Sequence, residues 1–251
     1  MFFIEKHLFL ILARFIKSFY LWGVMRYKNL TLIGTSHIAK QSVLQVKDII
    51  LKKDPDIIAI ELDRKRFFAL LHKKRGINLA DIKKIGVKGF LFQLIGALVE
   101  AKLGKIVGVK PGSEMIAAIK LAKEKKKRIA LIDQDIQITL RRFSQEFSFK
   151  EKINFIIDII SAPFKRKKIP FDLTKVPSRS VINELIKDVK SRYPNVYKVL
   201  IKERNDVMAR NFYNIMKEHP DKIILGIIGA GHEEEMINLI RKVFKEKKHS
   251  E

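Results

Sequence analysis

Four short apolar segments, separated by segments with a helical pattern, constrain the fold of this chain more than any other feature. They are rich in β-branched residues and have the length of buried strands. These segments are residues 29–34 (NLTLIG), 56–61 (DIIAIE), 128–132 (RIALI) and 222–229 (KIILGIIG). Apolar residues at helical spacing follow the first of them, between positions 42 and 53. Such alternation predicts an α/β fold in which helices flank a mostly parallel or mixed central sheet.

The length of 251 residues suits one large domain, or one domain with an insertion. Residues 136–220 have mainly helical patterns and lie between the third and last predicted strands, so we predict a helical insertion there. We expect an N-terminal amphipathic extension over residues 1–25, an α/β domain over 26–242 and a charged tail over 243–251.

The extension includes an apolar stretch, residues 8–24, that Arg14 and Lys17 interrupt. About 20 uninterrupted apolar residues are needed to span a bilayer. Three interpretations remain open: residues 2–24 lie on a membrane surface, form a degenerate signal anchor, or precede the true translation start at Met25.

Composition excludes several kinds of site. The chain has no cysteine, which rules out disulfides, cysteine-ligated zinc and a cysteine nucleophile. Its net charge of +24 attracts polyanions, or reflects a lysine-rich and isoleucine-rich proteome. The basic runs at 123–128 and 165–168 contain no interleaved aromatic residues, so the pattern does not favour a nucleic-acid surface.

Two Gly-x-x-His motifs end predicted strands: Gly34-Thr35-Ser36-His37 after the first, and Gly229-Ala230-Gly231-His232 after the last. A strand that turns abruptly into a helix needs positive φ or a close backbone approach, which glycine permits. Open α/β sheets bind ligands beyond the carboxyl ends of their strands. We therefore predict that His37 and His232 belong to one site.

Acidic residues accompany these histidines. Glu61 closes the second predicted strand, and Asp133 and Asp135 follow the third, so parallel strands would place them on the same edge. Each also has a structural reading, as a helix cap for Glu61 and as turn residues for the aspartates. Two histidines with carboxylates suit Mn, Co or Zn with an open position for water. Glu61 is then a ligand or a general base, and Glu114, in a first helical turn, is a second candidate base.

With these residues in hand, the sequence resembles the TraB/PrgY family, which is related to the Tiki metalloproteases and more distantly to the erythromycin esterase and ChaN-like folds. The resemblance covers roughly residues 28–240. The segments that carry it are LIGTSHIAKQSVLQVKDII (32–50), PDIIAIELDRKRF (55–67), PGSEMIAAIKLAKEKKKRIALIDQDIQITLRRF (111–143), ERNDVMARN (203–211) and GIIGAGHEEEM (226–236).

The resemblance implies a site built on both Gly-x-x-His motifs and on polar residues between them. The metal positions that it implies are His37, His232 and Glu61, and the catalytic positions are Glu61, Glu114, Arg204 and Arg142. Arg204 would stabilise an oxyanion or anchor a substrate carboxylate. Additional polar candidates are Ser36, Asp133, Asp135 and Arg210. The three arginines lie in helical segments, where a solvated face is the default interpretation.

The function implied is a metal-dependent, peptidase-like hydrolase. Tiki relatives are regarded as metal-dependent proteases of a secreted signalling protein, and PrgY-like members are associated with pheromone shutdown. The partner expected is thus a peptide substrate or ligand, and a homo-oligomer is compatible with the sequence. Alternatives are a non-catalytic peptide-sequestering protein and a basic protein that binds nucleic acid or a membrane surface. Family members commonly continue into C-terminal transmembrane helices, whereas this sequence ends in a Lys/Glu-rich stretch. We expect a cytoplasmic protein, or a membrane-associated one attached through residues 2–24.

Overall fold

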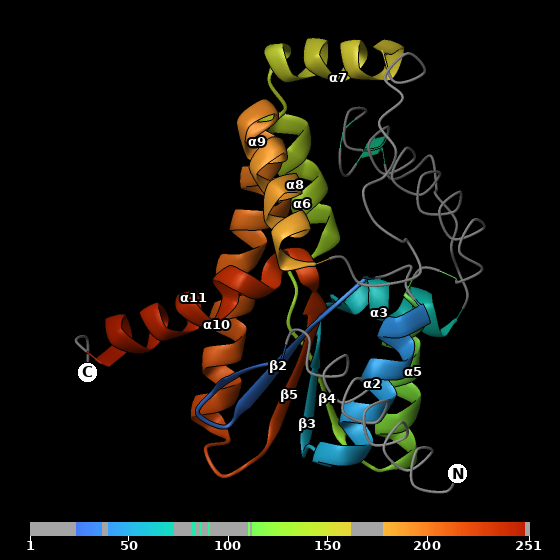
Figure 1. The fold of residues 1–251 in the computed structure, drawn as a ribbon, viewed down its shortest axis with the longest axis vertical. Coiled ribbons are helices and arrows are strands. Elements are labelled where there is room, and N and C mark those ends of the chain that lie inside the picture. The colour runs from blue at the N-terminus through green and yellow to red at the C-terminus, as the bar shows by residue number, and fades with distance from the viewer. Residues whose placement is uncertain are drawn as a thin grey trace, which may run out of the picture.

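A five-stranded sheet forms the centre of the protein (Figure 1). The computed structural model describes residues 24–36, 40–72, 112–161 and 178–248, together with Ile82, Lys83, Gly86, Phe90 and Lys110. Across the sheet the strands are β1 (Val24–Tyr27), β2 (Leu30–Thr35), β5 (Ile224–Gly229), β3 (Ile57–Ile60) and β4 (Arg128–Leu131). β1 pairs antiparallel with β2, and the other neighbours are parallel. The predicted mixed α/β sheet is confirmed.

Helices cover both faces of this sheet. Neighbouring residues of each strand point to opposite sides, and because β2, β3 and β5 are buried throughout, each side needs a layer of helices. On one side, Leu32, Ala59 and Ile228 belong to the same buried cluster as residues of α10 (Glu203–Glu218) and α11 (Ala230–Lys248). On the other side, Ile33, Ile58 and Ile227 pack with α2 (Lys40–Lys53) and α5 (Ser113–Glu124). With both faces buried, the parallel strands are continuous apolar runs, which is why sequence pattern located them.

The predicted helical insertion lies between β4 and β5 and is confirmed. It comprises α6 (Ile136–Glu146), α7 (Phe149–Ser161), α8 (Arg179–Arg192), α9 (Pro194–Tyr197), the π-helical turn η2 (Lys198–Lys202) and α10. Figure 1 shows α6, α8 and α9 as a column that rises beyond the sheet, with α7 lying across its far end. The short α3 (Arg64–Leu71) follows β3 on the opposite flank.

The chain ends of the described fold differ from the expected domain limits. β1 begins at Val24, and Met25 pairs with Leu32, so the sheet includes residues that the sequence assigned to the extension. α11 continues to Lys248, and Phe244 packs edge-on against Tyr213, with ring centroids 4.7 Å apart. The apolar stripe of α11 thus extends into the expected charged tail. Most of residues 2–24 lie outside the described residues, and no described helix is both long and apolar enough to cross a bilayer.

A buried carboxylate joins α7 to α9. Ser148 and Glu151 form a capping box: the Ser148 amide donates to Glu151 Oε2 at 2.9 Å, and the Glu151 amide donates to Ser148 Oγ at 3.3 Å. Glu151 Oε1 also accepts hydrogen bonds from the amides of Asn195 (2.8 Å) and Val196 (3.3 Å), at the start of α9. One side chain therefore satisfies the exposed amides at two helix N-termini.

We expect Glu151→Gln to lower the free energy of unfolding by about 1.5–3 kcal/mol at neutral pH, because it removes charge-assisted hydrogen bonds. Burial alone raises the pKa of Glu151, but donors from Ser148 and Asn195 outweigh it and lower the pKa. The contribution is therefore complete above the unfolded pKa of about 4.3 and is lost as pH falls through the lower folded pKa. Urea unfolding at a series of pH values should show the difference from wild type shrinking in acid. Glu184→Gln on the exposed surface of α8 is the matched control and should show no such trend.

Candidate functional site

The two Gly-x-x-His motifs leave the sheet from adjacent parallel strands at the same level. Gly34 of β2 pairs with Ile228 of β5, and Thr35 pairs with Gly229. His232 is 7% exposed and lies in the first turn of α11, directly after β5. The turn after β2 is held by the Ser36 amide, which donates to Ser42 Oγ at 2.8 Å. His37 follows this turn and lies outside the described residues.

The glycines of these turns do not serve as positive-φ residues; the described glycines with positive φ are Gly86 and Gly112. Gly34 permits a close backbone approach instead, because a Cβ there would lie 3.1 Å from Ala230 Cα, in addition to 2.4 Å from the end of the Glu233 side chain. The Gly229 amide donates a hydrogen bond to Glu61 Oε2. Gly231 would place a Cβ in ordinary contact with Ile186, at 3.9 Å. Of the two reasons expected for glycine, the structure supports close approach at Gly34.

Arg204 lies at the centre of a buried polar cluster at the carboxyl edge of the sheet. Its Nε and Nη2 donate to the two oxygens of Asp133, at 3.0 and 2.6 Å, and Nη2 also donates to Glu61 Oε1. Nη1 donates to the carbonyl of Leu200 in η2, at 3.1 Å. The side chains of Arg204, Glu61 and Asp133 are 16%, 3% and 0% exposed. A bidentate arginine–carboxylate pair of this kind is held in one geometry.

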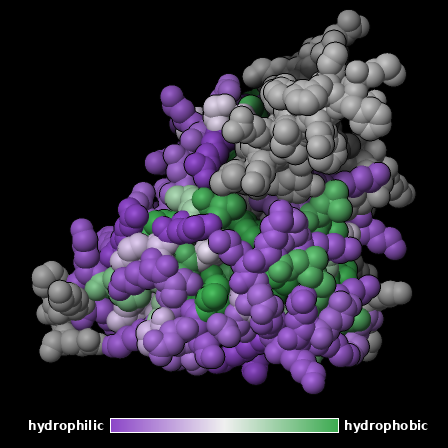
Figure 2. Space-filling view, turned by 60° about the horizontal axis from the view of Figure 1, so that its bottom comes forward, coloured by the Kyte–Doolittle hydropathy of each residue, from purple (hydrophilic) through white to green (hydrophobic). Residues whose placement is uncertain are grey.

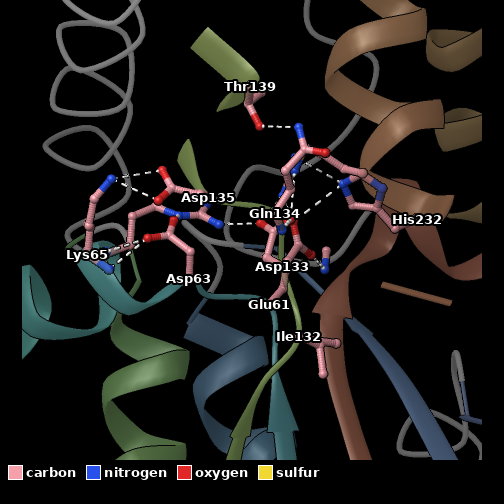
Figure 3. Close-up of polar contacts among 12 residues, drawn as sticks. Glu61, Asp63, Lys65, Ile132, Asp133, Gln134, Asp135, Thr139 and His232 are labelled. Carbon is pink, nitrogen blue, oxygen red and sulfur yellow. Dashed lines mark hydrogen bonds and ion pairs between the residues drawn. The ribbon is translucent and has the colours of Figure 1, made fainter. Parts of the chain in front are cut away.

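His232 completes this group, which we call the carboxyl-edge cluster: Glu61, Asp133, Arg204 and His232. The ring Nδ1 lies 2.5 Å from Asn205 Oδ1, and Asn205 Nδ2 donates to Glu235 at 3.0 Å. Because an amide oxygen only accepts, Nδ1 carries a proton, and in the neutral ring Nε2 holds the lone pair. Nε2 lies 3.4 Å from Glu61 Oε1 and 3.3 Å from Arg204 Nη1. Figure 3 shows Glu61, Asp133 and His232 converging just beyond the strand ends.

Sequence reasoning missed a second arginine beside the cluster. Arg66 Nε donates to Asp63 Oδ2 at 2.6 Å, and its Nη2 donates to Asp133. Asp63 also caps α3 by accepting from the amides of Lys65 (2.7 Å) and Arg66 (3.1 Å). The first turn of α3 is RKR and contains no acidic residue, although the helix dipole disfavours cations there. Three cations in the first turn of a helix are unfavourable, so this sequence could have indicated that carboxylates from elsewhere lie close to them.

Both guanidiniums remain charged although Arg204 is mostly buried and Arg66 is partly buried. Burial lowers the pKa of Arg204, but Glu61 and Asp133 outweigh it and raise the pKa above the usual value. Burial also lowers the pKa of Arg66, and the neighbouring Asp133 and Asp63 reverse the effect. Two guanidiniums against the three carboxylates of Glu61, Asp63 and Asp133 leave a formal charge of −1 before His232 is counted. A bound cation, or a proton on His232, would neutralise this charge.

The remaining candidates have other contacts. Asp135 caps α6 through the Gln137 amide and pairs with Lys65 at 2.8 Å, as Figure 3 shows. Arg142 pairs with Glu203 (2.7 Å) and Glu146 (3.0 Å).

Glu114 is 1% exposed, in the first turn of α5, and Arg210 is exposed on α10. Across the part of the chain that the structure describes, which omits His37, no three His, Asp or Glu side chains are arranged to hold a metal ion.

A comparison with known proteins now identifies the family. The chain is 34% identical over 219 residues to an uncharacterized protein of Methanocaldococcus jannaschii. This match covers 86% of this chain and 54% of that protein. It is 22% identical over 227 residues to a TraB domain-containing protein of Bos taurus and 21% identical to that of Homo sapiens, each covering 80% of this chain and 59% of the relative. The chain thus spans little more than half the length of these relatives. The sequence model of the TraB/PrgY/gumN family matches residues 20–243, and the chain belongs to this family.

Proposed function

We propose that this protein is a metal-dependent hydrolase that cleaves a peptide or amide bond at the carboxyl-edge cluster. The observation that carries the proposal is the enclosure of Arg204, Glu61, Asp133 and His232 together where β3, β4 and β5 end. Burying charged groups costs several kcal/mol per ion, and the apolar clusters on both sheet faces already supply a core. A charged cluster at the ligand-binding edge of an α/β sheet is therefore best explained by function.

Two donor atoms of the cluster support a divalent ion in this proposal, and the bound ion would replace their contacts with Arg204. His232 Nε2 and Glu61 Oε1 are 3.4 Å apart, a separation suited to adjacent ligands whose bonds to zinc are each about 2.0–2.2 Å. Asn205 fixes the ring through Nδ1, the usual second contact of a metal-ligating histidine. The third ligand that we propose is His37, whose motif leaves β2 level with the end of β5. Mn, Co and Zn all accept such a nitrogen and oxygen set.

When bound, the ion would polarise the scissile carbonyl and lower the pKa of a water molecule. Glu61 Oε2 is held by the Gly229 amide, so Oε1 is the oxygen directed toward His232 and Arg204. Glu61 can therefore serve as a ligand or accept a proton from water. Arg204 places a permanently charged donor beside these groups, and its Nη1 lies 3.3 Å from His232 Nε2. With an ion bound to Nε2, this Nη1 donor would be released to hold a substrate carboxylate or a developing oxyanion. Asp133 and Leu200 keep the guanidinium in position.

Metal binding tests this proposal without requiring the substrate. Calorimetric titration of the metal-free protein should detect a site for Mn, Co or Zn, and His232→Ala and His37→Ala should each weaken it at least tenfold, since loss of even a supporting contact costs about 10–100-fold. The matched control is His219→Ala, whose ring contacts Arg128 Nη1 away from the cluster. If no ion binds, or if the His219 and His232 variants behave alike, the metal site is refuted.

Turnover distinguishes the hydrolase from the peptide-sequestering alternative. A peptide library incubated with the metal-loaded protein should be cleaved, and a chelator or Glu61→Gln should abolish cleavage. Binding of peptides without turnover, unaffected by the chelator, would instead support sequestration.

A further inference from the structure

Helix α7 presents its polar side to the protein and its apolar side outward. Glu151, Asn154 and Asp158, spaced three and four residues apart, share one side of the helix. Four apolar residues share the opposite side: Phe149, Ile153, Ile156 and Ile157 are 75%, 42%, 55% and 49% exposed. An ordinary surface helix of a soluble domain has the reverse arrangement, with its apolar stripe against the core.

Specific contacts fix this orientation. Glu151 binds the start of α9 as described above, and Asn154 Nδ2 donates to the carbonyl of Arg192 at 3.3 Å. Asp158 pairs with Arg192, with Nη2 to Oδ1 at 2.7 Å, and accepts from the Tyr193 hydroxyl at 2.6 Å. The polar side therefore contacts the protein over two turns of helix. Rotating α7 to bury its apolar stripe would break all of these contacts.

The outward side is the densest group of exposed apolar residues on the described surface. Of the eleven large hydrophobic residues that are exposed there, four lie on the 13 residues of α7. The others are distributed over α2, α3, α6, α8 and the residue just before β5. Figure 2, which views another face, shows a mainly hydrophilic surface with separate hydrophobic areas. A continuous exposed stripe of this kind marks an interaction surface.

The charges beside the stripe favour an anionic surface as its partner. At helical spacing, Lys150 and Lys152 lie on its two borders, and the sequence continues after α7 into the basic run at 165–168. Lysines beside an apolar stripe suit an anionic lipid surface, where their stems extend along the hydrocarbon and their amines reach the headgroups. A second copy of this chain would bring the same lysines, and another net charge of +24, against them.

We propose that α7 docks the protein on an anionic membrane by inserting Phe149, Ile153, Ile156 and Ile157 between the lipid headgroups. The helix is 13 residues long, whereas about 20 are needed to span a bilayer, so it lies in the plane of the interface. Figure 1 places α7 at an extremity of the protein, across the end of the α6, α8 and α9 column, where a flat surface can reach it. This attachment is distinct from residues 2–24 and does not depend on the hydrolase proposal.

A fluorescent label can locate the contact, because the chain has no cysteine and an introduced one is unique. Ile153→Cys carrying an environment-sensitive dye should show a blue shift and a rise in emission with vesicles of phosphatidylcholine and phosphatidylserine. Leu44→Cys is the matched control, since Leu44 is 60% exposed but lies on α2. A response at both positions, or at neither, would refute docking through α7.

Vesicle sedimentation measures the strength of the contact. Replacing Phe149, Ile153 and Ile156 with Ser should reduce partitioning onto the anionic vesicles at least about tenfold, since each apolar side chain contributes to transfer from water. The double variant Leu44→Ser/Leu51→Ser changes exposed leucines on α2 and should bind as wild type does. Unchanged partitioning of the α7 variant, as attachment through residues 2–24 alone would give, overturns the proposal. So does a wild-type dimer that the same substitutions convert to a monomer.

Discussion

Replacing Arg204 with alanine is expected to lower the free energy of unfolding by about 3–5 kcal/mol, the usual cost of removing one partner from a buried ion pair. The guanidinium is the shared partner of Glu61 and Asp133, whose side chains are 3% and 0% exposed. Its removal takes a positive charge away from both carboxylates at once, while Arg66 still pairs with Asp133. The buried charge of Glu61, left without Arg204, should therefore account for most of the lost unfolding free energy.

Urea unfolding of three variants tests this explanation. Arg142→Ala is the matched control, because Arg142 also pairs with two carboxylates but is 35% exposed, and it should cost about 0–1 kcal/mol. Adding Glu61→Gln to Arg204→Ala should restore part of the lost stability, since it removes the charge left without Arg204. If Arg204→Ala costs no more than Arg142→Ala, or if the added Glu61→Gln destabilises further, the buried charges are not what Arg204 stabilises.

The strands and the convergence of the site residues could be predicted because both depend on local pattern and strand direction. Continuous apolar runs marked β2, β3, β4 and β5 to within two residues at each end. Parallel pairing then placed Glu61, Asp133 and His232 on one edge. β1 was not predicted, because its sequence VMRY is short and only partly apolar. Its position depends on pairing with β2, which sequence pattern does not reveal.

Strand direction could not identify the partner of these residues, which only the family resemblance indicated, because Arg204 comes from a helix distant in sequence. Arg204 is 143 positions from Glu61 and 71 from Asp133, and helical spacing alone does not distinguish it from the exposed Arg210. Asp135 shows a related limit: it is only two residues beyond Asp133, yet its carboxylate caps α6 and pairs with Lys65. Proximity to a strand end therefore identified the edge but not the orientation of each side chain.

Truncating a core side chain where α10 packs on the sheet should destabilise the protein as much as replacing Arg204 does. Phe212 is fully buried between α10 and β5, and we expect Phe212→Ala to cost about 3–5 kcal/mol in unfolding free energy. Phe149→Ala removes the same side chain from a position that is 75% exposed and should change stability by no more than about 0.5 kcal/mol. Urea unfolding of both variants gives the comparison. If Phe212→Ala cost as little unfolding free energy as Phe149→Ala is expected to cost, the packing of α10 on β5 would contribute little to stability.

The fit of Phe212 depends on the absence of a side chain at Gly226. A Cβ at Gly226 would lie 2.7 Å from Phe212 Cζ and 2.7 Å from Leu32 Cδ1, so Gly226→Ala should cost about 1–3 kcal/mol through overpacking. In a Phe212→Leu background the ring is gone and the added methyl has room, so the same substitution should cost less. This double-mutant cycle isolates the contact, because residues that share a space do not contribute additively. An additive result would show that Leu32 or the strand backbone, and not the Phe212 ring, is what requires glycine in β5.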